Sequence, residues 1–98
     1  MKVKSNIKMQ YKRALILQSQ EGDWETLYID GVKIDSGHTL NEGKDRGIYF
    51  MEIAQKHSLE LHDFQIMKAP DNINKYANDY GEFPRYELMI SMLMQDQK

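Results

Sequence analysis

Apolar residues near the start of the chain follow the pattern of a buried β-strand. Within Tyr11–Gln18 (YKRALILQ), the four consecutive apolar residues at positions 14 to 17 send side chains to both sides of an extended backbone. A strand that is apolar on both sides belongs in the interior of a sheet, covered on both faces. The weaker alternation upstream either extends this strand or leaves residues 1–10 as a frayed, basic arm.

The strongest local pattern is a β-hairpin over Trp24–Ser36 (WETLYIDGVKIDS). Two alternating runs flank Asp30-Gly31, the pair that a two-residue type I′ turn prefers. This turn sets a register with Leu27 opposite Ile34 on an apolar face. The other pairs that this register predicts are Ile29 with Val32, Tyr28 with Lys33, Thr26 with Asp35 and Trp24 with Gly37.

The rest of the chain predicts helices and one further strand. After a loop at 39–43, apolar residues at helical spacing predict a helix over Asp45–His57, and residues 58–68 contain a short strand pattern. Pro70 and Gly81 bracket an amphipathic helix. Segment 85–94 fits both a helix opened by Pro84 and an alternating strand, and we favour the helix.

These elements predict one α+β domain over residues 1–98. We expect a small antiparallel sheet, a β-meander containing the Asp30-Gly31 hairpin, packed against two or three helices. A domain of 98 residues buries only somewhat over ~60% of its unfolded surface, so self-association into a homo-oligomer is expected to add stability.

Composition narrows the chemistry. The chain has no cysteine, which excludes disulfides, thiolate nucleophiles and sulfur-ligated metal sites. No stretch approaches the ~20 apolar residues that span a bilayer, and the N-terminus lacks an apolar signal region. We therefore expect a cytoplasmic protein with no membrane partner and no cofactor.

Charge is unevenly distributed around the net value of −2. Lys2, Lys4, Lys8, Lys12 and Arg13 all precede the first acidic residue, Glu21. This stretch is either a solvated arm or a basic strand that faces an acidic or phosphate-bearing partner. The acidic remainder would repel phosphates, so nucleic-acid binding ranks last among the hypotheses.

The first candidate chemical site, a metal site, has an ordinary structural alternative. His57, Glu60, His62 and Asp63 lie close in sequence, but their spacing matches no standard metal site, and a structural role near a helix C-terminus accounts for His57. We predict no metal site.

A second candidate is a small hydrolase or transferase that uses His38 with Glu25 or Asp35. No strained nucleophile turn or oxyanion arrangement accompanies these residues, so no catalytic residue is assigned.

The segment 41–47 (NEGKDRG) suggests a site for an anion. It brings glycines, Lys44 and Arg46 to an expected helix N-terminus, where backbone N–H groups favour negative charge. The alternative is that Gly43 and Asp45 turn and cap the chain while both cations are solvated. The outer face of the hairpin adds three further candidates, and His38 follows the hairpin. The candidate ligand-binding residues are therefore Trp24, Tyr28, Lys33, His38, Lys44 and Arg46.

The segment Trp24–His38 (WETLYIDGVKIDSGH) resembles a segment of small, uncharacterised bacterial and phage proteins with a W-E-x-L-Y-x-D-G core followed shortly by G-H. The resemblance implies no known activity. It implies a phage or mobile-element accessory protein, a setting in which compact proteins sequester host components. We therefore expect a non-catalytic binding module whose partner is a host protein or an anionic small molecule.

Overall fold

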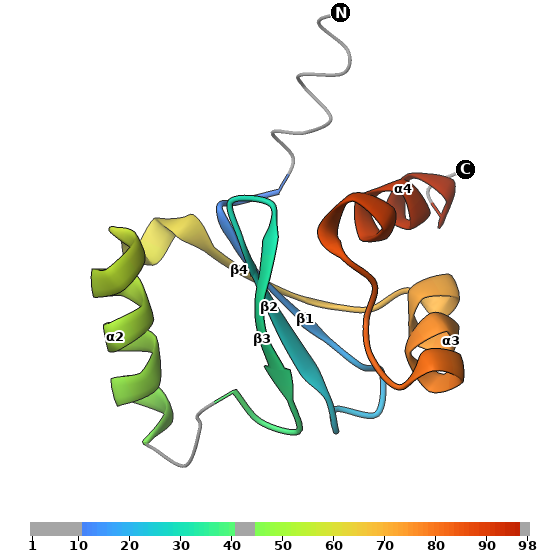
Figure 1. The fold of residues 1–98 in the computed structure, drawn as a ribbon, viewed down its shortest axis with the longest axis horizontal. Coiled ribbons are helices and arrows are strands. Elements are labelled where there is room, and N and C mark those ends of the chain that lie inside the picture. Colours follow the sequence, from blue (N-terminus) through green and yellow to red (C-terminus); the bar gives the residue numbers. More distant parts are fainter. Residues whose placement is uncertain (1–10, 41–44, 97–98) are drawn as a thin grey trace, which may run out of the picture.

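The computed structural model describes residues 11–40 and 45–96 as three layers, with a four-stranded sheet between helices (Figure 1). Helix α2 covers one face of the sheet, and helices α3 and α4 cover the other. This confirms the predicted α+β class. The elements are β1 (Ala14–Gln18), β2 (Glu25–Ile29), β3 (Val32–Gly37), α2 (Arg46–His57), a short 3₁₀ helix (Leu61–Asp63), β4 (Phe64–Lys68), α3 (Asp71–Tyr80) and α4 (Tyr86–Asp96).

Strand β1 lies inside the sheet, as its apolar run predicts. It pairs with β2 on one side and with β4 on the other, and residues 14 to 17 are all buried. Ala14 and Ile16 belong to the apolar cluster under α2, whereas Leu15 and Leu17 belong to the cluster under α3 and α4. Two apolar clusters therefore share the central strands.

The β2–β3 hairpin is confirmed, but its predicted register holds only near the turn. Tyr28 pairs with Lys33 as expected, and then a β-bulge leaves Ile34 without a partner, so that Leu27 faces Asp35. Gly37 consequently lies opposite Glu25 rather than Trp24. The physical reason is that one extra residue in β3 shifts every later pair by one position. β3 is an edge strand, where bulges are common.

The sheet is mixed rather than purely antiparallel. Strand order is β3-β2-β1-β4, and β4 pairs with β1 in parallel, Ala14 opposite Phe64. Parallel pairing follows from the long connection through α2. This helical crossover carries the chain from the end of β3 back to the end of the sheet where β3 began, so β4 runs in the same direction as β3 and β1. The β1–β2–β3 meander is as predicted, but the sheet was predicted to be antiparallel, and β4 departs from that.

The helices begin and end close to their predicted limits. Asp45 caps α2 by accepting hydrogen bonds from the Gly47 and Ile48 amides, and Gly81 ends α3 in the left-handed conformation. The segment after Pro84 is a helix, α4. Residues 1–10, which include the predicted basic arm, lie outside the described residues.

Candidate functional site

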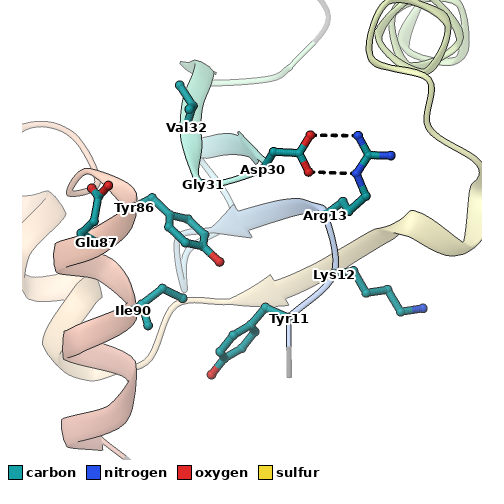
Figure 2. Close-up of a pocket in the computed structure, with 9 residues that line it drawn as sticks. All are labelled: Tyr11, Lys12, Arg13, Asp30, Gly31, Val32, Tyr86, Glu87 and Ile90. Atoms are coloured by element: carbon teal, nitrogen blue, oxygen red, sulfur yellow. Dashed lines mark hydrogen bonds and ion pairs between the residues drawn. The ribbon is translucent and has the colours of Figure 1, made fainter. Parts of the chain in front are cut away.

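An open groove lies at the end of the sheet that carries the Asp30-Gly31 turn, and we call it the turn-end groove. It has a volume of about 740 Å³ and is open to solvent. Three segments that are distant in sequence form it: the residues leading into β1, the hairpin turn and the first turns of α4 (Figure 2). The residues that line it are Tyr11, Lys12, Arg13, Asp30, Gly31, Val32, Tyr86, Glu87 and Ile90.

Arg13 holds one wall of the groove in place. Its Nε and Nη2 donate to the two carboxylate oxygens of Asp30, each at 2.8 Å, in a bidentate pair. Nη1 and Nη2 also donate to the carbonyl oxygens of Ser58 and His57, each at 3.2 Å, at the C-terminus of α2. The hydrogen bonds from Arg13 also lower the pKa of Asp30. The Arg13 guanidinium is therefore committed to the protein's own acceptors.

Tyrosine and aliphatic side chains supply the apolar surface of the groove. The Tyr86 ring packs over the hairpin turn so closely that a methyl group on Gly31 would lie 3.7 Å from it. Behind it, the Tyr86 ring meets Tyr28 with 5.8 Å between centroids. Burial raises the pKa of Tyr86, and the neighbouring Tyr11 and Glu87 raise it further. Val32, at the hairpin turn, also lines the groove and is 57% exposed.

Arg46, the cation of segment 41–47 that the structure describes, is not free to bind an anion. Arg46 forms a bidentate ion pair with the buried Glu25, each contact at 2.9 Å, and its guanidinium lies 5.1 Å from the Phe50 ring centroid. The Asp45 side chain already accepts hydrogen bonds from the backbone amides of Gly47 and Ile48 at the start of α2. Lys44 lies outside the described residues. Asp45 caps the helix as the alternative predicted, but Arg46 is ion-paired rather than solvated, so the predicted anion site lacks a free arginine.

Glu25 is held as a carboxylate at the opposite end of the sheet from the groove. Burial alone would raise its pKa, but hydrogen bonds from Arg46, from Gln18 and from the Leu40 amide, with the charge of Arg46, lower the pKa below its usual value. All of these donors point at two oxygen atoms. Glu25 therefore serves to join β2 to α2.

The predicted outer face of the hairpin is covered by α4 and the loop before it. Tyr28 is fully buried, and its hydroxyl donates to the Pro84 carbonyl at 2.6 Å, so it does not lie on an exposed face of the hairpin. Lys33 Nζ donates to the Phe83 carbonyl at 2.7 Å and to Glu82 at 3.1 Å. The reason is tertiary, because the returning chain packs on the face that the isolated hairpin would leave open.

Trp24 and His38 do come together, as an edge-on ring pair with 5.1 Å between centroids. His38 is exposed, and its Nδ1 lies 3.0 Å from the Asp23 carbonyl oxygen. The Trp24 indole N–H is buried without an acceptor among the described residues. This pair lies beside the loop between β1 and β2, away from the groove.

The His38–carboxylate arrangement of the hydrolase hypothesis is not formed. Glu25 is paired with Arg46, and Asp35 accepts a hydrogen bond from the Tyr49 hydroxyl at 2.6 Å. Neither carboxylate is hydrogen-bonded to His38 in the described part of the chain. Within the same residues, no group of three or more His, Asp or Glu side chains could hold a metal ion.

Sequence reasoning missed the turn-end groove entirely. None of its nine residues was among the candidate ligand-binding residues, although the basic stretch through Lys12 and Arg13 was noted. No local pattern places Tyr86 beside Gly31, because that contact depends on how α4 packs on the sheet.

Comparisons of the chain with protein-family models, with curated proteins and with solved structures find no match. In the described part of the chain, no helix combines the length and apolar character needed to cross a membrane. The candidate function therefore rests on the groove itself.

Proposed function

We propose that the protein is a non-catalytic binding module that holds a segment of a partner protein in the turn-end groove. The observation behind this proposal is the open, partly aromatic groove built from three separate segments. Grooves that combine tyrosine with aliphatic side chains suit an inserted apolar side chain, and tyrosine is enriched in protein interfaces. The resemblance of the hairpin to phage and bacterial proteins makes a host protein our proposed source of that segment.

A protein segment fits these features better than an anionic small molecule does. Small ligands are bound in pockets that bury ~70–90% of their surface, which an open groove cannot do alone. Binding an anion would also require free cations. Of the two cations that line the groove, Arg13 is engaged by carboxylate and carbonyl oxygens of the protein, so Lys12 alone would have to hold the anion.

The test is selection of a random peptide library on the purified full chain, followed by binding to two double variants. Val32→Asn with Ile90→Gln makes the groove polar without adding charge. Met51→Gln with Leu61→Asn makes a matched change at apolar side chains that are 65% and 90% exposed outside the groove. We expect selected peptides to bind the groove variant at least about tenfold more weakly and the control variant unchanged.

Circular dichroism verifies that both variants fold, and the single change Val32→Thr provides a milder groove variant. Equal binding to all proteins, or no enriched peptide, would overturn the proposal. Native mass spectrometry of the protein alone adds a third outcome. A dimer that only the groove variant abolishes would show that a second copy of the chain occupies the groove, which also contradicts the proposal.

A further inference from the structure

The charges that remain available in the turn-end groove are few. Arg13 and Asp30 neutralise each other through the bidentate pair. Lys12 is exposed, and its ammonium makes no ion pair among the described residues, since only its backbone N–H donates, to Gln65. Glu87 is exposed and meets Arg85 at a loose 3.7 Å. An ion pair this long and this exposed is weak, so a partner's cation can displace it.

Lys12 and Glu87 lie on opposite sides of the groove. Figure 2 shows Glu87 at the α4 wall and Lys12 beyond the start of β1, with Tyr86, Ile90 and Tyr11 between them. A ligand that crosses the groove therefore meets a negative charge, then an aromatic and aliphatic surface, and then a positive charge. Complementary charges in that order determine which sequences bind and in what position.

Resting on the function proposed above, we infer that the partner segment carries an apolar side chain flanked by a basic residue on one side and an acidic residue on the other. The apolar side chain packs between Tyr86 and Ile90. The basic residue pairs with Glu87, and the acidic residue pairs with Lys12. In an extended segment, side chains two residues apart point to the same face, so such a pattern can present all three groups to the groove together.

The experiment repeats the peptide selection on charge variants of the full chain. From the wild type we expect peptides with both charges around an apolar residue. Glu87→Lys is expected to select acidic residues on both sides, and Lys12→Glu to select basic residues on both sides. Lys75→Glu, on α3 outside the groove, makes the same charge change as Lys12→Glu; it is the control and is expected to select the wild-type pattern.

Individual peptides then give the size of the effect. The most frequent wild-type peptide is expected to bind the Glu87→Lys variant about five- to tenfold more weakly, and replacing its basic residue by glutamate is expected to restore binding. Arg85→Ala, which frees Glu87, is expected to strengthen binding about twofold.

The outcomes separate this inference from the proposed function. Pools of identical charge pattern from the wild type and both groove charge variants would overturn the inference. The proposed function would still stand if those peptides lost affinity for the Val32→Asn/Ile90→Gln variant. Peptides that bind independently of the groove would overturn both.

Discussion

The two ends of the sheet differ in how their polar groups are used. At the end that carries the loop between β1 and β2, the Gln20 amide N–H donates to Asn74 Oδ1 at 2.9 Å, and the Gln20 side chain donates to Ala69 and Asp71. Lys68 Nζ donates to the Ser19 carbonyl at 3.3 Å. At the end that carries the hairpin turn, Arg13 ties Asp30 to the C-terminus of α2, and beside this pair the groove leaves tyrosine and aliphatic surface open to solvent.

This difference separates stability from binding. Side-chain hydrogen bonds and the Glu25–Arg46 pair lock the loop end and join the sheet to α2 and α3. Apolar side chains that remain exposed at the other end stabilise the fold little, because water still covers them. They become useful only when a partner removes that water. The following predictions test this division, starting with the largest effect.

Glu25→Gln tests the end of the sheet that carries the loop between β1 and β2. The substitution keeps the shape of the side chain but leaves Arg46 without its carboxylate. We expect the free energy of unfolding at pH 7 to fall by about 2 kcal/mol, less than for a fully buried pair because Arg46 is partly exposed. Urea unfolding measures the change. An unchanged free energy would mean that the pair does not stabilise the fold.

The same variant also tests how the free energy of unfolding depends on pH. The pKa of Glu25 is lowered in the folded protein. At a pH just below the ordinary pKa of glutamate, the folded state therefore binds fewer protons than the unfolded state does. The stabilisation is complete above about pH 4.3 and is lost as the pH falls through the lowered value. The difference between the wild type and the glutamine variant is therefore expected to shrink in acid, as followed by urea unfolding at a series of pH values.

Asn74→Ala tests the junction of the loop end with α3. Asn74 is buried, and its loss leaves the Gln20 N–H without its acceptor. We expect the free energy of unfolding to fall by about 1 kcal/mol, since the exposed Gln20 can partly turn to water. Asn78→Ala, at an exposed position of the same helix, is expected to change stability by less than about 0.5 kcal/mol. Equal losses in both variants would contradict the assignment.

Val32→Thr tests the open end with the smallest expected change. It replaces a methyl group by a hydroxyl on a side chain that is 57% exposed. We expect the free energy of unfolding to change by less than about 0.5 kcal/mol, while peptides selected on the wild type bind about threefold more weakly. A large loss of stability with unchanged binding would reverse the roles of the two ends.

Local patterns predicted the elements well. The Asp30-Gly31 turn, the apolar run of β1 and the Gly81 helix end each depend on residues close in sequence, and each was confirmed. The bulge at Ile34 was missed, because the apolar alternation within each strand does not reveal that one strand holds an extra, unpaired residue.

Contacts between distant segments were beyond the reach of these patterns. Alternation showed that one side of the hairpin carries Tyr28, but not that the chain after Pro84 would cover it. The sequence likewise showed Arg46 as a cation without showing that Glu25, 21 residues earlier, would be its partner. The groove combines segments from both halves of the chain, so no single segment predicts it.

The parallel pairing of β1 with β4 has a consequence for synthesis of the chain. Ala14 and Phe64 are partners, so one edge of the most apolar strand stays unpaired until the chain has grown by about fifty residues. At roughly 5 to 20 residues per second, the ribosome needs roughly 3 to 10 s for that interval. A nascent chain with β1, β2 and β3 therefore exposes an aggregation-prone edge, and early contact with a chaperone would protect it.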